Sequence, residues 1–202
     1  GNLAHALKTP LTVIMNAATA NADDLGDTVI REARTMRRQV DHHLARARAV
    51  GRRGSAHSRA EVWPSLESVE RAVARLYRHV RIDVDGPKHL SVHVERQDLD
   101  EMLGNLIENA AKYGGGSVFV TVGAQAGFVE FMIEDDGVGI PEEQRVRIFD
   151  RGVRLDSGKP GTGLGLAIVR DVAEIYEGTV ALEESEDLGG LLVRLRLPAA
   201  TG

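Results

Sequence analysis

A helix with one polar and one apolar face, followed by two glycine-rich turns, is the feature of this sequence that most limits its fold. The helix reads NLIENAAKY, and the turns read DDGVGIP and GTGLGLAIV. In a helix, Asn105, Asn109 and Lys112 project from one face, because residues three or four apart lie above one another. The opposite, apolar face consists of Met102, Leu103, Leu106 and Ala110. One face therefore belongs to a core, and the other is available to a polar ligand.

The polar helix face and the first turn carry complementary chemistry. An asparagine oxygen suits Mg²⁺ that arrives with a triphosphate, because a neutral ligand does not compete with the phosphates, and Asn109 is the expected metal ligand. Lys112 is then expected to meet phosphate charge. Asp135 follows an apolar run, 128–133, that reads as a strand, and its carboxylate is suited to accept a hydrogen bond from an exocyclic amine. Gly137 and Gly139 allow the backbone to approach a flat ring closely.

The second turn supplies a phosphate-binding end. Its glycines, at 161, 163 and 165, precede a helix whose N-terminal amides and dipole favour phosphate. Each turn alone is weak evidence, and an ordinary glycine-rich loop would explain it. The three elements in this order indicate an ATP pocket that is not a P-loop.

These motifs resemble those of the histidine-kinase branch of the family that also contains gyrase, Hsp90 and MutL, and the resemblance covers nearly all of the chain. RIFDRG looks like the phenylalanine box between the two glycine boxes. HALKTPL, near the start, looks like the phosphoacceptor box that usually reads H-E-L-[RK]-T-P-L. HALKTPL together with IFDRGVRLDSGKPGTGLGLAIV is most similar to PhoQ-type sensor kinases, which also lack an acid after the histidine.

The resemblance implies a role for each matching residue. His5 would be the phosphoacceptor, and Thr9, on the same helix face, would orient water for dephosphorylating the partner. Arg154 and Lys159, with Lys112, would face the phosphates, and Lys112 and Arg154 would act in catalysis. The remaining nucleotide contacts would be Tyr113, Ile140, Gly161, Thr162, Gly163, Leu164 and Gly165. The competing interpretations are a polar helix residue for Thr9, a solvated charged loop for the cations and simple packing for Tyr113.

Two positions depart from the patterns of relatives. Ala6 places a methyl group where most of the family has an acid beside the histidine. General-base assistance typically contributes about 10² to 10⁴ in rate, so its loss is expected to slow transfer without abolishing it. Asn105 stands where the ATP-hydrolysing relatives place a water-activating glutamate, four residues before the metal asparagine, which argues against fast hydrolysis.

Periodicity predicts an α+β chain of two domains. Apolar residues recur at three and four residues on both sides of a polar turn at 21–27, as in an antiparallel helical hairpin. Two helices alone cannot bury such stripes, so a four-helix homodimer is expected, and packing of the hairpin against the second domain stays open. The predicted domains are the hairpin at 1–51, a linker at 52–59 and an ATP-binding domain at 60–202. Alternating strands and helices predict a two-layer α/β sandwich of the GHKL (Bergerat) type, with a mixed sheet covered by helices on one face.

Composition limits the remaining classes. The 202 residues include no cysteine, so no disulfide framework or thiolate metal site is available. A net charge of -5 offers no case for nucleic acid. No apolar run approaches the roughly 20 residues of a membrane span. Because the chain begins just before His5, it is expected to be the cytoplasmic portion of an inner-membrane sensor, joined to the membrane only through missing N-terminal segments.

The expected function is that of an ATP-dependent protein histidine kinase core. It would bind Mg-ATP, phosphorylate His5 and pass the phosphoryl group to an aspartate on the receiver domain of a response regulator. The alternatives are an ATP-hydrolysing switch and a degenerate nucleotide-binding scaffold in which Ala6 has ended transfer. The signal, the regulator, the balance of kinase and phosphatase activity, and transfer within or between protomers do not follow from the sequence.

Overall fold

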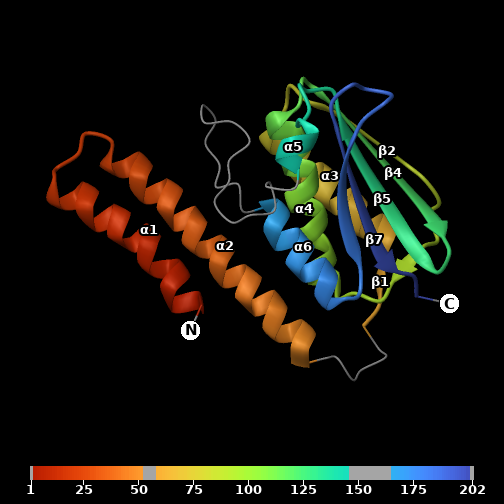
Figure 1. The fold of residues 1–202 in the computed structure, drawn as a ribbon, viewed down its shortest axis with the longest axis horizontal. Helices are drawn as coiled ribbons and strands as arrows, with labels where there is room; N and C mark the ends of the chain where they lie inside the picture. Colours follow the sequence, from red (N-terminus) through yellow and green to blue (C-terminus); the bar gives the residue numbers. More distant parts are fainter. Residues whose placement is uncertain (1, 52–57, 146–164, 201–202) are drawn as a thin grey trace.

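The computed structural model describes residues 2–51, 58–145 and 165–200, and it has a helical hairpin followed by an α/β sandwich (Figure 1). The helices are α1 (Asn2–Thr19), α2 (Leu25–Gly51), α3 (Val62–Leu76), α4 (Arg96–Tyr113), α5 (Glu142–Arg145) and α6 (Gly165–Ile175). The strands are β1 (Ala60–Glu61), β2 (Arg81–Asp85), β3 (Ser91–Val92), β4 (Ser117–Gln125), β5 (Phe128–Asp135), β6 (Thr179–Glu184) and β7 (Leu191–Pro198). This architecture confirms the predicted fold class. The domain boundaries stay predictions, since residues 52–57 lie outside the described residues.

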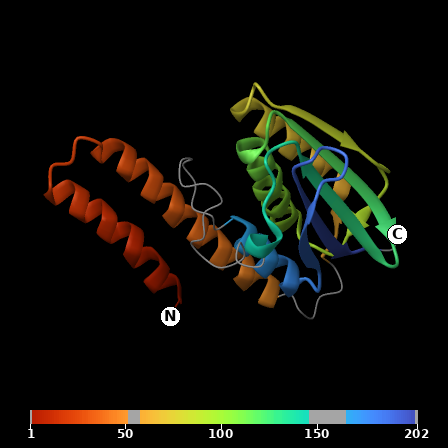
Figure 2. The ribbon, with the colours of Figure 1, turned by 45° about the horizontal axis from the view of Figure 1, so that its top comes forward.

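The sandwich is built on a five-stranded sheet with the order β2-β4-β5-β7-β6. Strands β2 and β4 are parallel, and the other pairs are antiparallel. Strands β4 and β5 are joined by the two residues Ala126 and Gly127, whose φ angles of 52° and 80° suit a tight hairpin turn. Helices α3, α4 and α6 cover one face of the sheet (Figures 1 and 2). The prediction of a mixed sheet covered on one side is therefore confirmed.

The core lies between α4 and the sheet. Leu99, Met102 and Leu106 on α4 are at most 1% exposed, and on the sheet Phe131 and Leu195 are fully buried. The apolar helix stripe expected from the sequence is therefore the packed face of α4. This packing fixes the rotation of α4 and turns its asparagine face away from the sheet.

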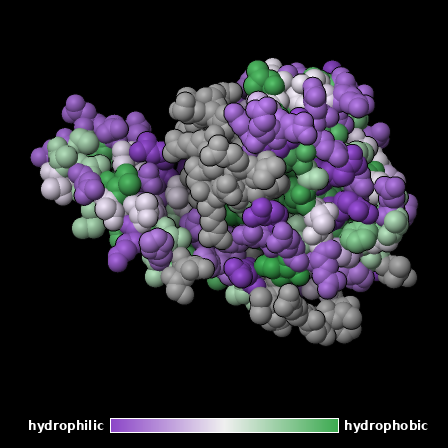
Figure 3. Space-filling view, viewed as in Figure 1, coloured by the Kyte–Doolittle hydropathy of each residue, from purple (hydrophilic) through white to green (hydrophobic). Residues whose placement is uncertain are grey.

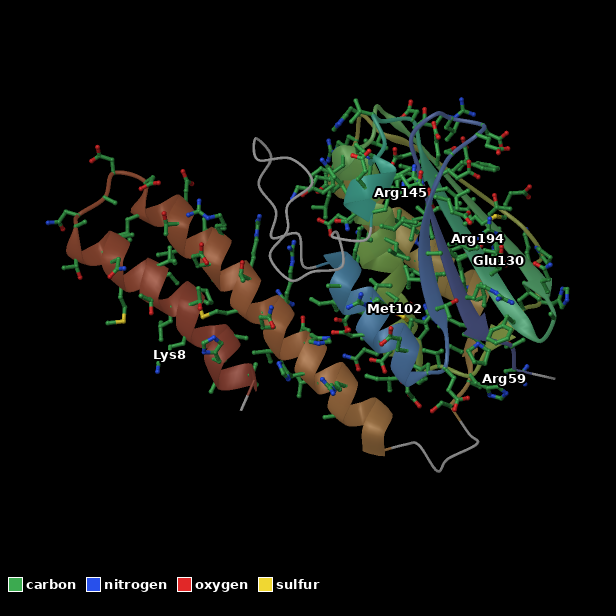
Figure 4. The ribbon with its side chains drawn as sticks, viewed as in Figure 1. Lys8, Arg59, Met102, Glu130, Arg145 and Arg194 are labelled. Carbon is green, nitrogen blue, oxygen red and sulfur yellow. The ribbon has the colours of Figure 1, made fainter. Side chains whose placement is uncertain are left out.

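The opposite face of the sheet is polar. Arg194 pairs with Glu130 and, at 2.9 Å, with Glu183, and Figure 4 shows Arg194 and Glu130 on the sheet. Arg196 adds a second contact to Glu130 at 3.6 Å. Ion pairs across neighbouring strands let this face remain in water while the other face is buried.

One helix and two short strands lie near the start of the sandwich. Helix α3 contains Pro64 in its first turn, a position where proline is tolerated because it costs no helical hydrogen bond. Strands β1 and β3 pair with each other in a separate two-stranded sheet, and each is two residues long.

The hairpin leaves much of its apolar surface uncovered. Leu11, Met15, Ile30 and Leu44 are 48%, 60%, 53% and 51% exposed. Two helices bury only the surface between them, so the exposure of these four residues in a single chain agrees with the expectation that a hairpin alone cannot bury its apolar stripes. Figure 3 shows apolar groups among polar ones on the hairpin surface.

Helix α2 also packs against α6 of the sandwich, and α2 lies between α1 and the sandwich in both ribbon views (Figures 1 and 2). At this contact His42 is 1% exposed, and its Nε2 atom lies 3.7 Å from Oδ2 of Asp171. The packing of the hairpin against its own second domain, which the sequence left open, is thus present in part through α2.

Candidate nucleotide-binding site

A cavity of about 560 Å³ opens where α4 and β5 end, a volume in the usual range of small-molecule sites. Its wall comes from the end of α4 and from the turn after β5. The lining residues are Tyr113, Gly114, Gly115, Asp135, Asp136, Gly137, Val138, Gly139, Ile140, Pro141 and Gln144. The structure thus brings together five of the predicted contacts, Tyr113, Asp135, Gly137, Gly139 and Ile140.

Asp135, the last residue of β5, has its two carboxylate oxygens in different situations. Oδ1 accepts hydrogen bonds from the backbone amides of Gly137, at 2.9 Å, and Leu191, at 3.2 Å. Among the described residues no donor reaches Oδ2, which leaves this oxygen for a ligand. Burial raises the pKa of Asp135 above its ordinary 3.8, the charge of Asp136 raises it further, and the two amide bonds oppose the shift.

Three glycines surround this carboxylate at distances that exclude a side chain. A Cβ atom on Gly190 would lie 2.3 Å from Oδ1 of Asp135, and one on Gly114 would lie 3.0 Å from its Cβ. A Cβ on Gly137 would meet the Tyr113 carbonyl at 2.8 Å. The cradle around Asp135 is therefore closed to any larger residue, and the backbone forms the pocket floor.

The polar face of α4 runs toward the cavity. Asn105, Asn109 and Lys112 are all partly exposed, as the periodicity predicted. The Nζ atom of Lys112 lies 5.5 Å from the centre of the Tyr113 ring, which lines the cavity. The two asparagines do not line the cavity itself. They extend the polar surface from its edge along the helix.

The second glycine box is described only from its last glycine onward. Arg154, Lys159, Gly161, Thr162, Gly163, Leu164 and the phenylalanine box lie outside the described residues. Gly165 is the first residue of α6, so a helix does follow the box as predicted. The following residues, Leu166 to Val169, are buried against the core.

The predicted phosphoacceptor region lies apart from the cavity. His5 and Thr9 are exposed on α1. Figure 4 shows Lys8, one turn after His5, on α1, while Arg145 lies on α5 at the cavity end of the sandwich. Arg145 donates from Nε to the carbonyl of Ile140 at 2.9 Å and so holds the turn after β5. Helix α2 separates the two regions in this arrangement.

Sequence reasoning missed two residues of the site. Gly190 touches Asp135 from the start of β7, and the glycine pair LGG before an apolar strand was its only signal. Asp136, whose side chain bonds to the turn after α4, was read only as part of the acidic turn. Both contacts join segments that are distant in the sequence, which periodicity does not reveal.

Comparison with known proteins agrees with this geometry. The family model for histidine kinase-, DNA gyrase B- and HSP90-like ATPases matches residues 94–201. The chain is 38% identical over 203 residues to the two-component sensor PhoQ of Pseudomonas aeruginosa, which covers 97% of this chain and 45% of that protein. The chain thus spans less than half the length of this curated relative.

Solved structures show the same fold. The mycobacterial sensor histidine kinase MprB is 25% identical with a TM-score of 0.65, over 73% of this chain and all of that one. The Acinetobacter baumannii histidine kinase AdeS, at 18% identity, has a TM-score of 0.66 over 98% of both chains, and at that identity it supports the fold alone. The expected resemblance is confirmed: the chain belongs to the family of histidine kinase-, DNA gyrase B- and HSP90-like ATPases, and its relatives are sensor histidine kinases.

Proposed function

We propose that this chain is the catalytic core of a sensor histidine kinase, which binds Mg-ATP in the cavity beside Asp135 and phosphorylates His5. The observation that carries the proposal is the state of Asp135, which lines the cavity, has Oδ1 fixed by two amides and, among the described residues, has no donor to Oδ2. A carboxylate oxygen so placed accepts a hydrogen bond from the exocyclic amine of adenine. Glycine backbone at 114, 115, 137 and 139 lines the cavity, and a flat base can approach such a backbone closely.

The phosphate end of the site is assigned from the side chains that can bind Mg²⁺ or phosphate. Asn109 offers a neutral oxygen to Mg²⁺, and Lys112 offers a positive charge, both from the polar face of α4. When bound, the ion would neutralise charge on the phosphates. Asn105 lies one turn before Asn109 on the same face. By resemblance to the sensor kinases, Arg154 and Lys159 would be further phosphate contacts. Residues 161–165, which lead into α6, would also contact the phosphates.

The transfer step needs only positioning and charge neutralisation. A neutral imidazole nitrogen of His5 attacks the γ-phosphorus, the bond from phosphorus to the bridging oxygen breaks, and ADP leaves with the electron pair. The imidazole then loses its proton, which Ala6 cannot accept, so water takes it. A receiver aspartate attacks the phosphorylated histidine in turn. Thr9 is proposed to orient water when the regulator is dephosphorylated.

Because His5 and the cavity lie apart, phosphoryl transfer requires a hairpin and a sandwich in a different relative arrangement. Either the sandwich leaves its place on α2, or the cavity of a second copy serves His5. A homodimer is supported by Leu11, Met15, Ile30 and Leu44, which two hairpins would bury together as a four-helix bundle. Sedimentation should show concentration-dependent association that Ile30→Asp weakens. Strictly monomeric behaviour at high concentration would count against the bundle.

The proposed place of this core is the cytoplasmic side of an inner-membrane sensor. The most relevant support is the two-component sensor PhoQ, which shares the sequence over nearly the whole of this chain. Within the described residues, every helix is either too short or too polar to span a bilayer.

Radiolabelled ATP tests the proposed reaction directly. The intact protein should acquire acid-labile label from γ-labelled ATP, and His5→Gln should acquire none while it still binds ADP. Label that then moves to a receiver domain would support the transfer. ATP hydrolysis without labelled protein would indicate an ATPase switch, and binding without either activity would indicate a scaffold.

A further inference from the structure

Asp136 bonds to a part of the chain that it does not adjoin in sequence. Its Oδ1 atom accepts hydrogen bonds from the backbone amides of Gly115 and Ser117, each at 2.9 Å. These amides belong to the connection between α4, which ends at Tyr113, and β4, which begins at Ser117. One carboxylate oxygen thus ties the exit of α4 to the end of β5.

The segment between α4 and β4 has few other conformations in which these two amides could find a different acceptor. A Cβ atom on Gly115 would lie 2.8 Å from the carbonyl oxygen of Asp136, so the two backbones are already in close approach. Gly116 has a φ of 130°, which side chains rarely adopt. Hydrogen bonds to an ionised carboxylate are stronger than those to a neutral oxygen. The hydrogen bonds that Asp136 accepts therefore hold this glycine turn in one conformation.

The same turn forms a wall of the cavity. Tyr113, Gly114 and Gly115 line it, and Gly114 lies against the Cβ atom of Asp135 on the other side. If the turn moved, both the ring of Tyr113 and the cradle around Asp135 would move with it. We propose that Asp136 is a positioning residue of the nucleotide site, which holds the α4–β4 turn against Asp135 and sets the electrostatic environment of that carboxylate.

The effect of Asp136 on the electrostatic environment of Asp135 follows from its charge. Asp136 raises the pKa of Asp135 by repulsion, in addition to the larger effect of burial. The other elements packed on Asp135 present backbone there, from Gly114 at the end of α4 and from Gly190 and Leu191 at the start of β7. Protonation of Asp135 removes a charged acceptor from the base-binding position. Nucleotide affinity should therefore fall on the acid side, and a neutral residue at 136 should move that fall to lower pH.

Two substitutions separate the parts of this role, which rests on the proposed nucleotide site. Asp136→Asn keeps an Oδ1 acceptor and removes the charge, whereas Asp136→Ala removes both. Calorimetric titration with ADP alone, repeated from pH 4.5 to 8, measures the base contact without the metal. At pH 8 we expect Asp136→Ala to weaken ADP binding by about tenfold or more, and Asp136→Asn to stay within about threefold of the parent.

The pH profile is the signature that a purely structural residue would not produce. We expect the acid limb for Asp136→Asn to lie at lower pH than that of the parent chain. Asp83→Ala is the matched control, because Asp83 lies on the outer edge strand β2 with a side chain that is 51% exposed. This variant should change neither the ADP affinity at pH 8 nor the pH of the acid limb. Circular dichroism and the urea midpoint of each variant establish that it is folded.

Each outcome decides the proposal. Unchanged ADP affinity in Asp136→Ala, an equal loss in both variants, or an acid limb that does not move in Asp136→Asn would overturn it. If Asp136→Ala fails to fold, the profile of Asp136→Asn still decides. Failure of the parent chain to bind ADP would instead remove the proposed function, so the two failures are distinct.

Discussion

At the scale of single residues, Asp135, the proposed base-binding group, is a buried carboxylate that lowers the stability of the fold. Its carboxylate is buried, which raises its pKa above 3.8. The folded state then binds a proton more tightly than the unfolded state. Its contribution to the free energy of unfolding therefore falls as the pH rises from 3.8 through the raised pKa, and at neutral pH the charged group destabilises the fold.

Asp135→Asn should accordingly separate binding from stability. The amide oxygen can still accept the bonds from Gly137 and Leu191, and no charge is left buried. We expect ATP and ADP affinity to fall together by about tenfold or more, since both share adenine. The urea midpoint at pH 7 should be equal to or above that of the parent chain. Normal discrimination of adenine by this variant would remove Asp135 from base recognition.

At the scale of elements, two glycines with opposite surroundings test the packing of α4 and β7. Gly104 lies inside α4 with nothing within 4 Å of an added Cβ, whereas Gly190 meets the backbone of Asp135 at 2.3 Å. Gly104→Ala should raise the free energy of unfolding by about 0.5–1 kcal/mol, because alanine loses less entropy in a helix.

Gly190→Ala should do the opposite. The added methyl group cannot be accommodated without moving β5 or β7, which costs about 1–3 kcal/mol and displaces Asp135. Urea denaturation measures both variants, and ADP titration should show a loss for Gly190→Ala alone. Equal stability of the two variants would mean that the start of β7 does not lie against Asp135.

At the scale of the whole molecule, the contact between α2 and α6 holds the sandwich on the hairpin. His42 and Asp171 lie in this contact, and α2 stands between α1 and the sandwich. Since His5 is on α1, this arrangement keeps the cavity from the proposed phosphoacceptor. Weakening the contact between α2 and α6 should therefore increase the population of arrangements in which phosphoryl transfer can occur.

His42→Ala is expected to raise the rate of autophosphorylation by up to about tenfold without changing ADP affinity, because the residue lies on α2 and is not one of those that line the cavity. Asp171→Asn should act in the same direction. Glu174→Gln, on the same helix in an exposed i,i+4 pair with Arg170, is the control and should have little effect. A lower rate in His42→Ala, with stability retained, would show that the contact assists transfer instead.

The sequence by itself determined the features that depend on neighbours in the chain. The two faces of α4, the strand that ends at Asp135 and the exposure of His5 all follow from periodicity and local motifs, because a helix or strand repeats its side chains at a fixed interval. The tertiary structure alone decided which distant segments meet. Leu191 reaches Asp135 across 56 residues, Ser117 reaches Asp136 across 19, and α2 rests on α6. The physical reason is that such contacts depend on how the sheet orders its strands and on the shape of the packed surfaces, and no local pattern carries that information.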